Sequence, residues 1–120
     1  MDIAKMIGEI RRHPEFHRAG MILVHNGVVR STSRDGRRVR GLRVSVNHER
    51  LGRILEEQKR RAGIIDIRVA IAENQDLAVG EDVMVLIVAG DVRENVIAVL
   101  SDSLNLIKTT VTEKTEYHLP

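Results

Sequence analysis

One run of eight residues constrains the fold of this chain more than any other segment. Residues 83–90, VMVLIVAG, are apolar without interruption and rich in β-branched side chains. The run is too short for a buried helix, so it predicts a strand at the centre of a sheet. The chain has 120 residues, of which 42% are hydrophobic, which is enough for one core and too little for two. Residues 1–120 are therefore expected to form a single domain.

Periodic apolar patterns predict the remaining elements. Helices are expected over residues 2–12, 47–63 and 91–108, and further strands over residues 20–29, 39–46, 64–73 and 109–117. The first two strands flank the sequence STSRDGR, whose Asp-Gly pair predicts a hairpin. Hairpin-linked strands with two substantial helices indicate an α+β fold. We expect a two-layer sandwich of a mixed, mainly antiparallel sheet, with two main helices and a short N-terminal helix.

The two main helices carry signals at their ends. Asn47 is the predicted N-cap of the first, and Gly63 is the predicted stop after it. Asp91 and Glu94 have the spacing of a capping box at the start of the second. The expected buried face of this second helix contains Val96, Ile97, Leu100, Leu104 and Ile107.

Positive charge is concentrated in one part of the chain. The net charge is only +2, but residues 30–43 contain six arginines against one acid, Asp35. Local positive charge of this kind favours a small anion or an acidic partner surface over a long nucleic acid. The chain has one Phe, one Tyr and no Trp on which bases could stack, so nucleic-acid binding ranks last among the hypotheses.

The sequence also disfavours several classes of site and location. Without Cys, a disulfide, a thiolate metal site and a Cys nucleophile are excluded, and a reducing compartment is indicated. No apolar run reaches about 18 residues, and the N-terminal segment is amphipathic, so we expect a cytoplasmic protein without a membrane span. His13 and His17 have helical spacing, but Pro14 lies between them, so no metal site is expected.

Basic residues near the ends of the last helix have two interpretations each. Backbone amides at the start of this helix could bind an anion beside Arg93, although an ordinary cap explains the same sequence. Lys108 suits a helix C-terminus, where the dipole favours a cation, and Lys114 suits a solvated strand edge. Either lysine could instead act as a base or an amine nucleophile if cations such as Arg30 and Arg93 lie beside it.

Three segments together resemble one known family. Residues 19–42, AGMILVHNGVVRSTSRDGRRVRGL, are similar to the opening strand, Gly-x-Val-Arg segment and Asp-Gly-Arg turn of the large, catalytic subunit of molybdopterin synthase. Residues 44–58, VSVNHERLGRILEEQ, resemble its first long helix, and residues 76–90, DLAVGEDVMVLIVAG, resemble its Leu-x-Ile-Gly-Glu turn and central strand. The interval from Arg93 to Lys108 matches the family's spacing without a gap.

The resemblance implies an enzyme of molybdenum cofactor biosynthesis. In that family the subunit is an α+β sandwich that forms a homodimer, and each protomer binds a small ubiquitin-like sulfur carrier. The carrier's C-terminal thiocarboxylate gives its sulfur to a cyclic pyranopterin monophosphate, which becomes the dithiolene of molybdopterin. The phosphorylated pterin is the substrate, and no resident cofactor is implied.

The resemblance also implies roles for particular residues. Lys108 would lie near the thiocarboxylate, with Lys114 as the second catalytic lysine. The substrate-binding candidates are Arg30, Arg93, Arg37 and Arg38. Guanidinium groups suit this role because they bind phosphate in a bidentate manner. Arg37 and Arg38 could instead belong to the loop, a partner contact or the rim, as could Arg34 and Arg40.

A second hypothesis is a relative without catalytic activity. Where the family usually has His before the Arg of the last helix, this chain has Val92, and TTVTEKTEY follows Lys108 in place of the family's Val-Pro-Ile-Trp-Lys-Lys-Glu-like segment. Such a relative would bind a protein partner or a small phosphorylated ligand through its basic loop. Similarity of fold alone does not decide between the two hypotheses.

Overall fold

The structure is a computed structural model that describes all residues from Met1 to Pro120. Its elements follow the chain in the order α1 (Ile3–Arg11), a 3₁₀ turn (Phe16–Arg18), β1 (Met21–Val28), β2 (Val39–Val46), α2 (His48–Lys59), β3 (Ile64–Ile71), β4 (Leu77–Ala78), β5 (Asp82–Gly90), α3 (Arg93–Leu106), a π-helical turn (Ile107–Val111) and β6 (Thr112–His118). The α+β class and the short N-terminal helix predicted from the sequence are confirmed. No helix has both the length and the apolar character needed to cross a lipid bilayer.

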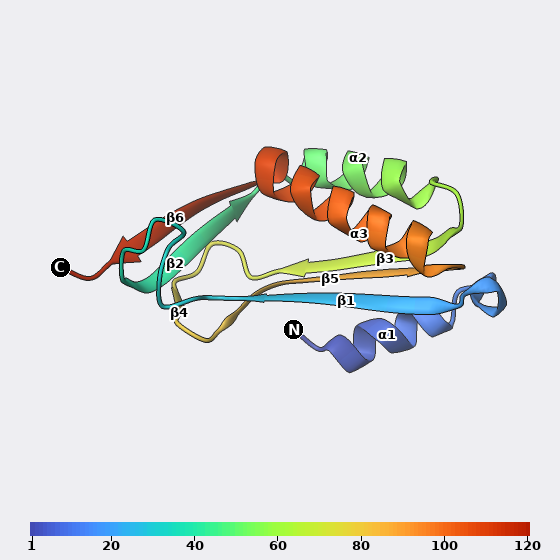
Figure 1. Ribbon diagram of the computed structural model, residues 1–120, viewed down its shortest axis with the longest axis horizontal. Helices are drawn as coiled ribbons and strands as arrows, with labels where there is room; N and C mark the ends of the chain where they lie inside the picture. Colours follow the sequence, from blue (N-terminus) through green and yellow to red (C-terminus); the bar gives the residue numbers. More distant parts are fainter.

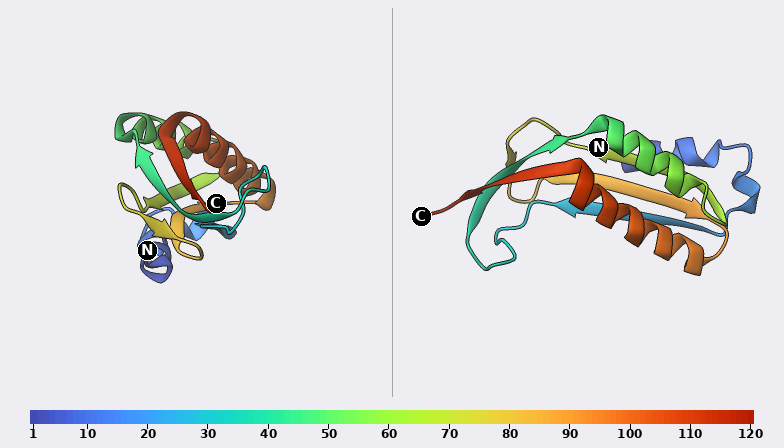
Figure 2. Two further views of the ribbon diagram at one scale, coloured as in Figure 1. Left: turned by 90° about the vertical axis from the view of Figure 1, so that its left-hand side faces the viewer. Right: turned by 90° about the horizontal axis from the view of Figure 1, so that it is seen from above.

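The strands form two separate three-stranded sheets, and every pairing is antiparallel. The main sheet has the order β1-β5-β3, and the second has the order β4-β2-β6. Helices α2 and α3 lie side by side over one face of the main sheet, and α1 covers the other (Figure 1; Figure 2). The second sheet extends beyond them as an arm, which gives the molecule dimensions of 52 × 25 × 24 Å. We call β2, β4 and β6 the arm.

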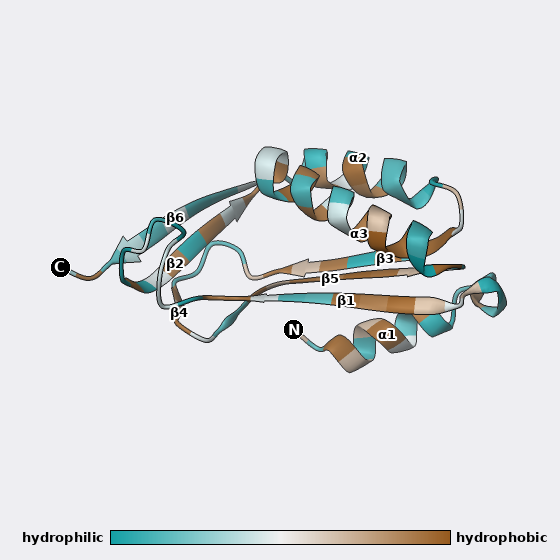
Figure 3. Ribbon diagram, viewed as in Figure 1, coloured by the Kyte–Doolittle hydropathy of each residue, from teal (hydrophilic) through white to brown (hydrophobic).

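Strand β5 is the central strand that its apolar run predicts. Residues 84–90 are all buried, with β1 on one side and β3 on the other. Met84, Leu86 and Val88 pack under α2 and α3. The alternate side chains, Val85, Ile87 and Ala89, pack under α1 together with Ile10. Figure 3 shows apolar residues in both α1 and β5. Because successive side chains of a strand point to opposite faces, one continuous apolar run supplies two cores.

The predicted hairpin between the first two strands is wrong. β1 pairs with β5, whereas β2 pairs with β4 and β6, so the two strands belong to different sheets. The turn itself does form: the Gly36 amide donates to the Ser33 carbonyl, Gly36 has φ +87°, and a bridge joins Thr32 to Arg38. The Asp-Gly signal thus closes a small local loop, and the chain crosses from one sheet to the other on either side of it.

The ends and buried faces of the helices agree with the sequence only in part. Asn47 is the N-cap of α2, as predicted, and its side chain accepts a hydrogen bond from the Arg50 amide. Helix α3 has no capping box, because its N-cap is Val92 and the Asp91 carboxylate accepts from the Val92 amide and the Asn95 side chain instead. The buried side of α3 contains Val96, Val99 and Ser103, while Ile97 is 51% exposed.

Candidate functional site

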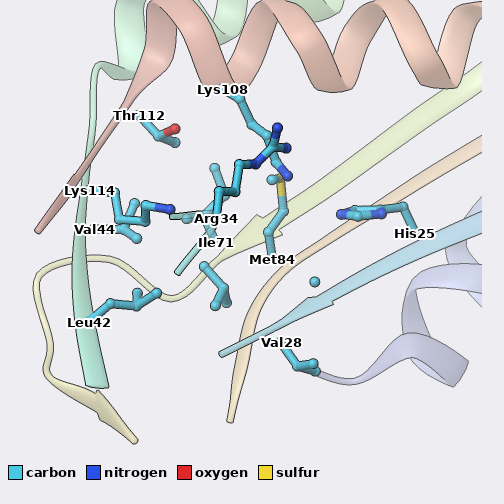
Figure 4. A pocket seen from close by; sticks show the side chains of 12 residues that line it. His25, Val28, Arg34, Leu42, Val44, Ile71, Met84, Lys108, Thr112 and Lys114 are labelled. Carbon is cyan, nitrogen blue, oxygen red and sulfur yellow. The ribbon is translucent and has the colours of Figure 1, made fainter. Parts of the chain in front are cut away.

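A cavity of about 310 Å³ lies where the arm meets the main sheet. Its wall is half apolar and includes residues of β1, β2, β3, β5 and β6, of the loop between β1 and β2, and of the π-helical turn (Figure 4). The apolar lining residues are Val28, Leu42, Val44, Ile71, Val83 and Met84. The polar lining residues are His25, Arg34, Lys108, Thr112 and Lys114, and Gly27 completes the set.

Lys108 enters this cavity from the π-helical turn that follows α3. Ile107 and Val111, on either side of Lys108 in sequence, are 0% and 3% exposed and fix the turn in the core. The hydroxyl groups of Thr109 and Thr110 donate to the carbonyl oxygens of Asn105 and Leu106, at 2.8 and 2.6 Å. π-helical turns are rare and are frequent at functional sites. The sequence predicted the end of a helix here but not this turn, for which the Thr-Thr pair is the visible signal.

Lys114 reaches the same cavity from β6. It lies opposite Val44 of β2, and its ammonium is 3.9 Å from the Glu116 carboxylate. Its side chain is 54% exposed, so it lies at the open side of the cavity. The two predicted catalytic lysines therefore lie around one cavity. The alternative interpretation placed Lys108 at a helix end and Lys114 at a solvated strand edge.

Arg34 is a third cation of the cavity, and the loop between β1 and β2 carries it. The Asp35 carboxylate accepts hydrogen bonds from the Ser33 hydroxyl, the Arg37 amide and the Arg37 guanidinium. These bonds, that of Ser33 above all, lower the pKa of Asp35 to about 2. Asp35 is thus ionised near neutral pH and holds the turn in which Arg34 points to the cavity.

His25 lines the inner part of the cavity from β1. Its Nε2 atom is buried and has no hydrogen-bond partner. A Cβ atom on Gly27 would lie 3.2 Å from this nitrogen, so the missing side chain of Gly27 leaves space for the imidazole ring. Burial of the ring, and then the positive charge of Lys108, lower the pKa of His25. The imidazole is therefore neutral at pH 7.

The charges of this site favour an anion. Arg34, Lys108 and Lys114 contribute three positive charges, and the one carboxylate in an ion pair with any of them is that of Glu116. No group of three or more His, Asp or Glu side chains is arranged to hold a metal ion. Cations above an apolar wall suit a ligand that combines an acidic group with an apolar or planar body.

Comparison with known proteins shows the family to which this chain belongs. The family model described as "MoaE protein" matches residues 1–110. The chain belongs to the MoaE family. This family is that of the molybdopterin synthase large subunit, so the resemblance predicted from the sequence is confirmed. A sequence search of curated proteins found no match.

Solved structures of the MoaE fold superimpose on most of the chain. A molybdopterin synthase from Staphylococcus aureus has a TM-score of 0.72 at 19% identity, over 88% of this chain and 77% of that chain. A MoaE protein of molybdopterin biosynthesis from Burkholderia ambifaria has a TM-score of 0.76 at 18% identity, over 99% and 82%. A complex of subunits 1 and 2 of molybdopterin-converting factor from Helicobacter pylori has a TM-score of 0.72 at 15% identity, over 98% and 80%. At these identities the likeness shows the fold.

Within this MoaE chain, the four predicted substrate-binding arginines do not line the cavity. The Arg30 guanidinium donates to the Thr32 carbonyl at 2.8 Å, and Arg37 is paired with Asp35. Arg38 follows them in the same loop. Arg93 begins α3 and pairs with Glu94 at 3.3 Å, whereas Lys108 comes after the end of that helix. At about 1.5 Å per helical residue, roughly 20 Å separate the two positions in one chain.

The backbone amide of Val92, the N-cap residue of α3, has a side-chain partner. The Asp91 carboxylate accepts from the Val92 amide at 2.6 Å and from the Asn95 side chain at 2.9 Å. These bonds, that of Asn95 first, lower the pKa of Asp91. A carboxylate of the chain itself therefore lies at this helix end, where the helix dipole favours a negative charge.

Proposed function

We propose that this chain is the catalytic large subunit of a molybdopterin synthase. It would transfer sulfur from the C-terminal thiocarboxylate of a ubiquitin-like carrier to a cyclic pyranopterin monophosphate. The observation that carries the proposal is the position of Lys108 and Lys114, which come from different elements and line one cavity. Membership of the MoaE family supplies the context for this chemistry.

The cations of the cavity suit such a reaction. At each of two carbons of the pterin side chain, a thiocarboxylate sulfur forms a bond as a carbon–oxygen bond breaks, and the oxygen leaves as water or stays on the phosphate. Water then breaks the bond between that sulfur and the carrier's acyl carbon. Negative charge develops on the acyl oxygen during this hydrolysis, and an ammonium group such as that of Lys108 stabilises it. The carrier leaves with an ordinary carboxylate. A dithiolene contains two sulfur atoms, so each molecule of product consumes two carriers.

The partner and the assembly are part of the same proposal. The Helicobacter pylori structure is a complex of two subunits, which supports a small carrier subunit as the partner of this chain. Arg30 and Arg93 keep their proposed roles in binding the pterin phosphate. Since Arg93 is roughly 20 Å along the helix from Lys108, it would serve the cavity of a second copy in a homodimer.

Single-turnover conversion of the cyclic pyranopterin phosphate tests this function. With thiocarboxylated carrier supplied, we expect wild-type protein to form molybdopterin and Lys108→Ala to be slower by about 100-fold or more, because a charge at the reacting group is lost. The matched control is Lys5→Ala, which removes an exposed lysine of α1 far from the cavity. Equal rates for Lys108→Ala and Lys5→Ala would exclude Lys108 from the mechanism.

Binding without catalysis is the second candidate function. Val92 is 49% exposed at the position where the family usually has His, and this replacement favours the alternative. In that case the wild-type chain would bind the carrier yet form no molybdopterin, while an active large subunit converts the same carrier and substrate. Conversion by the wild-type chain would reject this alternative.

A further inference from the structure

The loop between β1 and β2 carries four arginines that look alike in the sequence, at positions 30, 34, 37 and 38. In the structure they differ. Arg30 donates to a backbone carbonyl, and Arg37 is paired with Asp35 through both its amide and its side chain. Arg38 does not line the cavity, whereas Arg34 does. The loop therefore presents one of its arginines to the site.

The position of Arg34 follows from the bonds around it. Ser33 is 9% exposed and anchors the turn, since its amide donates to the Arg37 carbonyl and its hydroxyl to Asp35. Asp35 accepts hydrogen bonds from Ser33, which precedes Arg34, and from Arg37, which follows Gly36. It makes no ion pair with Arg34. Asp35 is the one acid within the arginine-rich segment, so its pairing with Arg37 leaves the Arg34 guanidinium available.

In the view of Figure 4 the Arg34 side chain lies between those of Lys114 and Lys108, and all three line the cavity. Neither Arg34 nor Lys108 has a carboxylate partner in the structure. Two cations at one cavity repel each other, and an anion placed between them is attracted by both. A guanidinium adds directional donors that match the two oxygens of an acid group, while an ammonium acts as a compact point charge.

We propose that Arg34 is a further substrate-binding residue, which acts with Lys108 to hold one terminal acid group of a ligand. The inference rests on the proposed function and makes it more specific. Two sources offer this chemistry: the C-terminal acid of the carrier and the phosphate of the pterin. Both present oxygen atoms on one centre that a guanidinium binds with two donors.

Binding measurements separate the two sources without requiring turnover. The probes are a short peptide that ends in Gly-Gly with a free carboxylate, the same peptide with an amidated C-terminus, and inorganic phosphate. Each is titrated into the full chain, and the dissociation constant is obtained from NMR shifts of the amides around Lys108. We expect the peptide with the free carboxylate, inorganic phosphate, or both to bind to the wild type. If the carrier is the source of the acid group, the amidated peptide should bind at least about 10-fold more weakly than the free acid.

The decisive variant is Arg34→Gln, compared with Arg12→Gln as a control for the loss of one exposed arginine. Arg12 is exposed at the C-cap of α1, and its side chain is outside the cavity. We expect Arg34→Gln to weaken binding of the acid probe by about 10-fold or more, with Arg12→Gln unchanged. Arg34→Lys should recover only part of the affinity, because the charge returns without the paired donors.

Each outcome decides the inference. Weaker binding of the peptide acid alone assigns Arg34 to the carrier, and weaker binding of phosphate alone assigns it to the pterin. Equal affinities for Arg34→Gln and Arg12→Gln would overturn the proposal, as would absence of binding of either acid to the wild type. Arg34-dependent binding by a chain that forms no molybdopterin would retain this binding site while rejecting the catalytic function.

Discussion

At the scale of single residues, the cavity brings together groups of very different chemical surroundings. Three cations face solvent, whereas the Nε2 atom of His25 is buried without a partner. A histidine with this burial beside Lys108 remains neutral near pH 7, so it does not add a fourth charge to the site.

The surroundings of His25 predict how stability depends on pH. The folded-state pKa lies below the unfolded value of 6.5, so the unfolded chain takes up a proton first as pH falls. Above pH 6.5, His25 does not make the stability depend on pH. As pH falls from 6.5 through the lowered pKa of His25, the folded state loses stability relative to the unfolded chain. His25→Phe should remove that loss, and at pH 7 it should stabilise the fold by roughly 1 kcal/mol because an unpaired buried nitrogen disappears.

Urea unfolding at pH 7.5 and pH 5 measures this effect. The control is His17→Phe, which replaces an exposed histidine of the 3₁₀ turn. The wild type and the control should lose more stability between the two pH values than His25→Phe does. A His25→Phe variant with the same pH dependence as the wild type would contradict the prediction.

Sequence alone could predict part of this site. The sequence singles out Lys108 through its spacing from Arg93 and Lys114 through family resemblance, and both reach the cavity. Arg34 could not be distinguished from its neighbours, because the difference depends on which arginine Asp35 binds. The environment of His25 was equally hidden, since it depends on the space over Gly27 and on a lysine distant in sequence.

At the scale of elements, local patterns predicted the five longer strands better than their pairing, and they did not predict the two-residue strand β4. The apolar run of β5 and the turn at Gly36 follow from nearby residues. The assignment of β1 and β2 to different sheets does not follow from nearby residues, because both strands have the same kind of apolar pattern. The choice is made by β5, which is buried on both faces and takes β1 and β3 as its neighbours.

Two glycines give an opposing pair of predictions about elements. A Cβ atom on Gly41 of β2 would lie 2.5 Å from the Leu77 carbonyl oxygen of β4, so Gly41→Ala should push β4 away and destabilise the fold by about 1–3 kcal/mol. Gly52 lies within α2 with no atom within 4 Å of such a Cβ, so Gly52→Ala should stabilise by roughly 0.5–1 kcal/mol. Thermal unfolding of the two variants tests both signs. Equal effects would show that the close contact between β2 and β4 is unimportant.

At the scale of the whole molecule, the elongated shape separates residues that the proposed function requires together. Arg93 lies at one end of α3, and Lys108 lies beyond the other end. The apolar run of β5 is not available for a dimer contact, because β5 lies between β1 and β3 and its residues 84–90 are buried. Strand β6 is an edge strand of its sheet and is available for such a contact.

A homodimer with shared sites predicts complementation between two inactive variants. Light scattering should give twice the mass of one chain. When Lys108→Ala and Arg93→Ala chains are co-expressed, mixed dimers should contain one cavity with both residues intact. Turnover should recover to about a quarter of the wild-type value, because about half of the dimers are mixed and half of their sites are complete. Failure to exceed the sum of the separate variants would place Arg93 outside the partner's site.

The π-helical turn between α3 and β6 has a further consequence for how this site can change in evolution. Lys108 is fixed to the main sheet through buried Ile107, while Lys114 belongs to the arm. The gap between the two amines therefore depends on the angle at which the arm leaves the turn. A substitution that alters this angle would fit the site to a wider or narrower acid group while every lining residue stays the same. Specificity in such relatives could diverge through the hinge, with no trace in the residues that contact the ligand.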